Sequence, residues 1–167
     1  LSIVGAVLHI AAHALGKITL FFAAGSIYTA SKKTHVSQLG GIGRRMPWTM
    51  TAFAIASLSM IGLPPTAGLI SKWYIVLGAV DTDQWVALAV IFLSTLLNAG
   101  YFLPIVYKAF FGPEPDAGGL PDEIVADHKE APWPVVASLT LTAAGTVAMF
   151  FFPGPFLALA RAVAGLG

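Results

Sequence analysis

Four long apolar stretches, separated by short polar segments, constrain this chain more than any other feature of its sequence. They cover residues 3–30, 46–80, 84–111 and 133–166. Each exceeds the roughly 20 apolar residues that a helix needs to cross the hydrocarbon core of a bilayer. All eight carboxylates lie between Asp81 and Glu130, and none falls inside a stretch. We therefore predict an all-α, polytopic transmembrane helical bundle with four spans at these positions.

The composition excludes most other classes of protein. The chain is 57% hydrophobic and only 10% charged, whereas soluble domains carry about 25% charged residues. A net charge of +1 offers no basic surface for nucleic acid. The absence of cysteine excludes disulfides, thiolate metal sites and cysteine nucleophiles. Because no phosphate loop, Ser/His/Asp set or dinucleotide fingerprint occurs either, we expect no cofactor and no enzymatic bond chemistry.

The polar segments between the stretches predict an orientation. Segment 31–45 is basic and contains no acid, which is typical of a cytoplasmic loop. The short acidic segment 81–83 is then expected on the outer side, and segment 112–132 on the cytoplasmic side. Both ends of the chain would face outward. We expect a multi-pass protein of the cell's inner (plasma) membrane.

The stretch 46–80 is too long for one straight span. As a continuous helix it would be about 52 Å long, far beyond a hydrocarbon core of about 30 Å. Pro64 and Pro65 lie at its middle, flanked by Gly62 and Gly68, and two adjacent prolines interrupt helical hydrogen bonding. A discontinuous helix accounts for this pattern better than a hairpin of two short spans. Backbone groups freed at such a break are a candidate ion site.

Lys72 is the sharpest functional candidate, because it lies inside this broken span with no carboxylate in the same stretch. An intramembrane charge costs about 2.5–3.5 kcal/mol on insertion scales and is a functional candidate by default. A lysine can exchange its proton when partly desolvated, which an arginine cannot. The alternative is a lysine that extends toward the membrane interface from within the span.

His9, His13 and Lys17 follow one another at intervals of four residues, which places them along one face of the first helix. Imidazoles accept and donate protons near neutral pH, so such a row can relay protons through intervening waters. Two alternatives remain open: a pair of histidines satisfied within the core, or a metal site. The carboxylate or thiolate that completes such a metal site is missing, so we expect no metal.

A weaker polar stripe marks the third stretch. Its members are spaced at roughly helical intervals: Ser94, Asn98, Tyr101 and Lys108. The stripe is equally compatible with hydrogen bonds between packed helices and with a face in contact with water. Lys108, near the end of the stretch, is interpreted as an interfacial lysine.

These residues resemble a known family. The segment 9–17 is similar to the His/His/Lys helix of antiporter-like proton-channel subunits, and 39–47 is similar to the linker that follows it. The segment 62–72 resembles that family's broken helix, whose lysine or glutamate terminates a proton path. The family comprises large subunits of Mrp-type Na⁺/H⁺ antiporters and membrane-arm subunits of respiratory complex I and related hydrogenases. Within it the chain looks most like the D-type subunits of the multisubunit antiporters.

The resemblance implies a subunit of fourteen helices built from two inverted repeats. We expect this chain, residues 1–167, to be its C-terminal fragment, carrying the last four helices. A glutamate and a lysine that the family uses in its first repeat would lie outside the fragment. No carboxylate occurs in the four stretches, so an acidic partner for Lys17 or Lys72 would have to come from the remainder of the subunit.

The leading hypothesis is an ion-translocating subunit of a multisubunit Na⁺ (monovalent cation)/H⁺ antiporter. Its partners would be other membrane subunits, lipid, protons and Na⁺ or another monovalent cation. Protons would pass through His9, His13 and Lys17 to Lys72. One alternative is a proton-pumping subunit of complex I or of a membrane-bound hydrogenase. A second alternative is a membrane scaffold that conducts nothing.

Overall fold

The computed structural model describes residues 1–113 and 129–165, and all regular secondary structure in those residues is helical. The elements, in chain order, are α1 (Ser2–Ser31), the 3₁₀ turn η1 (Val36–Leu39), α2 (Ile42–Arg45), α3 (Pro47–Ile61), α4 (Ala67–Asp81), α5 (Trp85–Phe111), α7 (Trp133–Phe151) and α8 (Gly154–Val163). Helices α1, α5 and α7 are each long and apolar enough to cross a membrane. The predicted all-α transmembrane bundle is confirmed.

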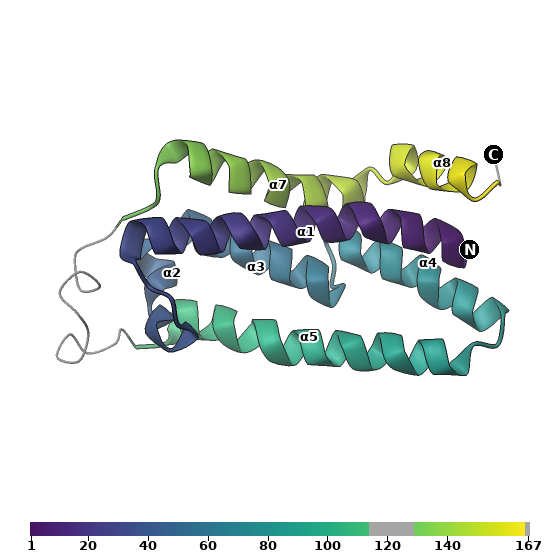
Figure 1. Cartoon of the computed structure of the whole chain (residues 1–167), viewed down its shortest axis with the longest axis horizontal. Helices are drawn as coiled ribbons and strands as arrows, with labels where there is room; N and C mark the ends of the chain where they lie inside the picture. Colours follow the sequence, from purple (N-terminus) through teal and green to yellow (C-terminus); the bar gives the residue numbers. More distant parts are fainter. Residues whose placement is uncertain (114–128, 166–167) are drawn as a thin grey trace.

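The long helices run side by side along one axis, and successive crossings alternate in direction (Figure 1). The C-terminal ends of α1 and α5 lie at one end of the bundle, together with the beginnings of α3 and α7. The N-terminus and the connection from α4 to α5 lie at the opposite end. This arrangement agrees with the expectation that segments 31–45 and 112–132 begin on the same side of the membrane.

The predicted break in the second span is present. Gly62 ends α3 with a left-handed backbone (φ 91°), and its N–H donates to the carbonyl oxygen of Leu58. Pro64 and Pro65 follow, and Thr66 is extended before α4 begins. Helices α3 and α4 continue in the same direction (Figure 1), so the segment is a discontinuous helix and the hairpin alternative is wrong.

The last apolar stretch differs from its prediction as one span over 133–166. Helix α7 ends at Phe151, and α8 begins at Gly154. Pro153 causes the interruption, because a proline disfavours the helical conformation in the residue before it; Phe152 has φ −124° and ψ 62°. The predicted end of this span at residue 166, and most of the predicted segment 112–132, lie outside the described residues.

Helix α1 is the central element, in contact with α3, α4, α7 and α8. Small residues let the helices approach closely: a Cβ atom on Gly5 of α1 would meet the backbone of Ile75 in α4. Hydroxyl pairs join the helices as well. The Thr19 hydroxyl donates to that of Thr142 at 2.7 Å, and Ser59 and Thr146 share a hydrogen bond of 2.8 Å. Both features are typical of helices packed in a membrane.

Glu130 fixes the N-terminal end of α3 from a distant part of the chain. Its carboxylate accepts hydrogen bonds from the backbone N–H of Trp48 at 2.7 Å and from the Thr49 hydroxyl at 2.7 Å. The Thr49 N–H donates to the same carboxylate at 3.3 Å. A negative charge is favourable at a helix N-terminus, where backbone N–H groups lack partners within the helix. The carboxylate thus ties the start of α3 to the residues that precede α7.

The close approach of α4 to α3 gives a first testable prediction. A Cβ atom on Gly68 would overlap the carbonyl oxygen of Ser59, so Gly68→Ala should push the two half-helices apart. We expect a loss of about 1–3 kcal/mol of stability, the usual range for overpacking. The measurement is thermal unfolding of the solubilised full-length subunit.

Gly100→Ala is the matched control, since outside Gly100, its chain neighbours and the adjacent backbone of α5 no atom of the described residues lies within 4 Å of the added Cβ. Alanine is favoured over glycine in a helix by up to about 1 kcal/mol, so this variant should be at least as stable as the original. Equal unfolding midpoints for Gly68→Ala and Gly100→Ala would contradict the close approach of Gly68 to the backbone of Ser59.

Candidate functional site

The ammonium group of Lys72 is held by three neutral oxygen atoms. Its Nζ donates to the carbonyl oxygens of Ile61 at 2.8 Å and Met60 at 3.2 Å, and to the Thr95 hydroxyl at 3.0 Å. The two carbonyls are available because α3 ends at Ile61, and the last four carbonyls of a helix have no partner within it. All three protons of an ammonium group can therefore be accepted here. Lys72 points back at the break instead of extending to the interface.

Gly62 makes this contact possible in two ways. Its φ of 91° is in the left-handed region, which a residue with a side chain rarely adopts, and a side chain here would displace the stem of Lys72. A Cβ atom there would lie 2.7 Å from Cδ of Lys72. The glycine predicted to flank the break thus also forms the surface on which the lysine stem lies.

His9 is connected to the residue next to Lys72. Its Nδ1 lies 3.0 Å from the hydroxyl oxygen of Ser71, which is fully buried and also donates to the carbonyl oxygen of Gly68 at 3.1 Å. The rings of His9 and His13 follow along α1 with their centroids 5.7 Å apart. Helices α1 and α4 thus bring the two predicted histidines to the same place as Lys72.

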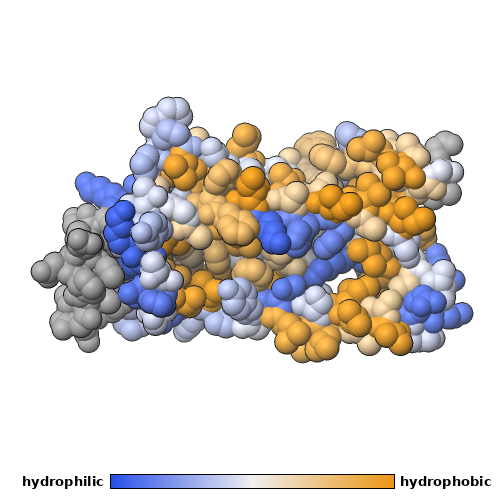
Figure 2. Space-filling view, in the orientation of Figure 1, coloured by the Kyte–Doolittle hydropathy of each residue, from blue (hydrophilic) through white to orange (hydrophobic). Residues whose placement is uncertain are grey.

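A cavity of about 200 Å³ lies between these groups. It is lined by residues of α1, both half-helices and α5: His9, Ala12, His13, Ser59, Met60, Gly68, Lys72, Ser94 and Asn98. A polar cavity of this size has room for several hydrogen-bonded waters. Hydrophilic residues gather about midway along the molecule, beside α1 and toward α5, with hydrophobic residues on either side (Figure 2). Ionisable residues within a membrane-spanning bundle are functional candidates by default, and three of them line this cavity: His9, His13 and Lys72.

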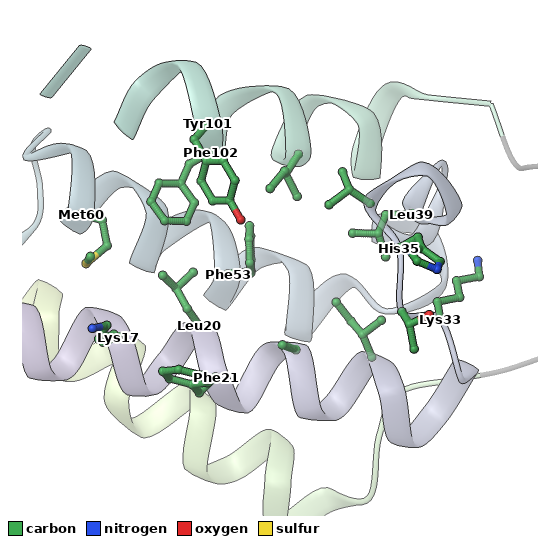
Figure 3. Close-up of a pocket in the computed structure, with 15 residues that line it drawn as sticks. Lys17, Leu20, Phe21, Lys33, His35, Leu39, Phe53, Met60, Tyr101 and Phe102 are labelled. Carbon is green, nitrogen blue, oxygen red and sulfur yellow. The ribbon is translucent and has the colours of Figure 1, made fainter. Parts of the chain in front are cut away.

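Lys17 does not share this cavity, although it continues the row of His9 and His13 along α1. It lines a larger cavity of about 470 Å³ that is open to the surface, bounded by α1, α3, α5 and the segment after α1. Lys17 and Met60 lie at one end of this cavity, and Lys33 and His35 lie at the other (Figure 3). Most of the wall between them is apolar, with aromatic side chains from α3 and α5. The four predicted residues are thus divided between two neighbouring cavities.

Three residues of the site were not predicted from the sequence: Ser71, Thr95 and Met60. None of them carried a signal, since a serine, a threonine and a methionine are ordinary residues of apolar helices. The polar stripe on α5 was noted, and two of its members, Ser94 and Asn98, do line the smaller cavity. Tyr101 lines the larger one. Among the residues that the structure describes, no group of three or more potential ligands (His, Cys, Asp or Glu) gathers around a common point.

Comparisons with known proteins place these features in a family. Residues 1–98 match the transmembrane family described as NADH:quinone oxidoreductase/Mrp antiporter. The N subunit of NADH-quinone oxidoreductase from Desulforudis audaxviator is 47% identical over 118 residues, which are 71% of this chain and 24% of that protein. The D subunit of the Na⁺/H⁺ antiporter from Alkalihalophilus pseudofirmus is 32% identical over 114 residues, covering 68% of this chain and 23% of that protein. The chain spans about a quarter of the length of these curated relatives.

A solved structure shares the fold. The chain resembles a protein chain in the structure of the Mrp complex from Dietzia sp. DQ12-45-1b with a TM-score of 0.82 and 22% identity. The match covers 95% of this chain and 36% of that one. The helical arrangement described above thus lies within a fold already known from a membrane complex.

Thr95 provides a prediction about how Lys72 is held. Thr95→Val keeps the shape of the side chain but removes the hydroxyl, which leaves one N–H of the ammonium without its acceptor. We expect a loss of about 0.5–1.5 kcal/mol, the net contribution of a typical hydrogen bond, because this donor is only part-buried. The measurement is again the unfolding midpoint of the solubilised full-length subunit.

Thr95→Ser is the control, because it retains the hydroxyl and should keep most of the stability. A Thr95→Val variant as stable as Thr95→Ser would mean that the threonine does not hold Lys72.

Proposed function

The chain belongs to the NADH:quinone oxidoreductase/Mrp antiporter family and is part of a membrane antiporter-like subunit, and from that premise we propose that it carries protons across the membrane. The proposed path consists of four ionisable residues: Lys72, His9, His13 and Lys17. Its partners are the other membrane subunits of a multisubunit complex, and its location is the plasma membrane. The protein would act as part of a transporter, with no bond chemistry of its own.

The way Lys72 is bound is the observation that carries this proposal. Its three acceptors are two carbonyls and a hydroxyl, all of them neutral. Removing one partner of a buried ion pair leaves an uncompensated charge and costs about 3–5 kcal/mol. Neutral acceptors impose no such penalty when the lysine gives up its proton. The site therefore suits a lysine that is charged in one step of a cycle and neutral in another.

The smaller cavity supplies the first part of the path. Lys72, His9 and His13 all line it, and waters within it would bridge the distances between them. Each imidazole can accept a proton on one nitrogen and release one from the other. The contact between Ser71 and Nδ1 of His9 orients that ring, which leaves its second nitrogen available to exchange protons.

The larger cavity supplies the second part. It begins at Lys17, one helical turn beyond His13, and extends to Lys33 and His35 near the end of the bundle (Figure 3). Protons would be exchanged between Lys17 and the side on which α1 ends through this cavity. The predicted cytoplasmic location of segment 31–45 makes this the cytoplasmic side.

Two kinds of assembly use such a path, and the identities favour one of them. The 47% identity with the N subunit of an NADH-quinone oxidoreductase supports a redox-driven proton pump. The second candidate is the one that the sequence analysis favoured, a Na⁺/H⁺ antiporter, and the 32% identity with the D subunit of such an antiporter supports it. In that case the assembled complex would exchange protons for Na⁺ or another monovalent cation.

Lys72→Ala tests the proton path. In inverted membrane vesicles that carry the full complex, we expect this variant to abolish proton transport, measured by a fluorescent pH-gradient probe, while the amount of assembled complex stays unchanged. The control is Lys108→Ala, since Lys108 lies in the last turn of α5 and lines neither cavity. Its transport should remain close to that of the original complex.

Normal transport by an assembled Lys72→Ala complex would overturn the proposal. That outcome would favour the scaffold alternative, in which the chain anchors its partners and conducts nothing.

The same vesicles separate the two assemblies. An electron donor such as NADH, with a quinone as acceptor, should acidify vesicles through a redox-driven complex, and Lys72→Ala should reduce that acidification. In the antiporter case the gradient is first set by an independent respiratory chain, and Na⁺, Li⁺ or K⁺ is then added. We expect the first response, and cation-dependent loss of the gradient that requires Lys72 would instead assign the chain to an antiporter.

A further inference from the structure

The two cavities of the proton path do not form one continuous space, and a single side chain borders both. We propose that Met60 is a hydrophobic gate between them, and that the charge on Lys72 sets its position. This inference rests on the proposed proton path, since the gate matters only if protons pass from His13 to Lys17. Three independent observations support it.

The first observation is the position of Met60 between the cavities. It lines the smaller cavity together with His13 and Lys72, and it lines the larger one together with Lys17. In the larger cavity it lies at the same end as Lys17 (Figure 3). Among the residues named above, Met60 is the one that lines both cavities, so the proposed boundary between them lies at this side chain. An apolar constriction excludes water and so interrupts proton transfer.

The second observation is the contact that holds the side chain there. Gly16 of α1 faces Met60: a Cβ atom on that glycine would lie 3.2 Å from the sulfur. Gly16 is buried and directly precedes Lys17. The thioether therefore packs against the backbone of α1 between His13 and Lys17, at the step of the row where the two cavities separate.

The third observation links the same residue to Lys72. The backbone carbonyl of Met60 accepts a hydrogen bond from Nζ of Lys72 at 3.2 Å. Met60 is also the second-last residue of α3, whose final carbonyls have no helical partner. When Lys72 loses its proton and its hold on these carbonyls weakens, the last turn of α3 is free to shift. The shift moves the Met60 side chain, which has three rotatable bonds and adapts readily.

The gate gives the path an order of events. With Lys72 charged and bound to α3, Met60 closes the passage between His13 and Lys17. With Lys72 neutral, the passage opens and water connects the two cavities. A proton then crosses only in one state of Lys72, which is what a coupled transporter needs to avoid a leak.

The test measures passive proton leak in vesicles that carry the full complex. A pH gradient is imposed without electron donor or added cation, and its decay is followed with a fluorescent probe. Met60→Ala shortens the side chain, and Met60→Gln keeps its length but makes it polar, so both should let water through. We expect decay about tenfold faster than in the original complex, equivalent to about 1.4 kcal/mol off the barrier.

Met60→Leu is the matched control, because it keeps an apolar side chain of similar volume and should leave the vesicles as tight as the original. Met60→Gln keeps the test valid if Met60→Ala fails to assemble. Faster decay in assembled Met60→Gln, with Met60→Leu unchanged, supports the gate. Tight vesicles with assembled Met60→Gln overturn it.

The outcome is distinguishable from failure of the proposed function. Loss of transport in Lys72→Ala together with tight Met60→Gln vesicles would retain the proton path and remove only the gate. Transport that survives in Lys72→Ala would remove the path through Lys72, whatever the leak measurements show.

Discussion

The hydrogen bonds between the Lys72 ammonium and the end of α3 are the interaction on which the rest of this structure depends. In a bilayer every backbone polar group needs a partner, so a helix cannot end at membrane depth unless protein or water satisfies its last carbonyls. The lysine satisfies two of those carbonyls, and the carbonyls in turn make a half-buried positive charge tolerable. Without Lys72, the carbonyl oxygens of Met60 and Ile61 at the break would lose their hydrogen-bond donor. Without the break, the Lys72 ammonium would lose these two acceptors. Each feature explains why the other is present.

The surrounding helices hold the break after α3 and Lys72 in position. Glu130 holds the beginning of α3, and Lys72 holds its end, so both termini of this half-helix contact a charge of the sign that its dipole favours. Small residues bring α4 and α1 close enough for His9 to contact Ser71. The polar cavity and the larger apolar one then lie on either side of Met60. The cavity at Lys72 and the cavity at Lys17 thus share Met60 as a common lining residue.

The sequence predicted the parts of this account that follow from local pattern. Apolar length predicted the crossings, Pro64 and Pro65 predicted the break, and an intramembrane lysine with no acid beside it marked Lys72. Helical spacing predicted that His9 and His13 lie along one face. Spacing does not say which residues of another helix meet that face, so Ser71 and Thr95 were missed. Helical spacing also grouped Lys17 with His9 and His13. Periodicity within α1 carries no information about Met60 of α3, which lies between the two cavities. The interruption at Pro153 was missed although a proline is a local signal, since the apolar run continues on both sides of it.

The central claim is that Lys72 carries a proton and is not merely a fixed cation that satisfies the carbonyls of α3. Lys72→Arg separates the two roles, because a guanidinium supplies donors and charge but does not give up its proton in proteins. The measurement is proton transport by vesicles carrying the full complex with this substitution, beside the amount of assembled complex. The account predicts normal assembly and no transport. Transport at the original rate by the Lys72→Arg complex would contradict it.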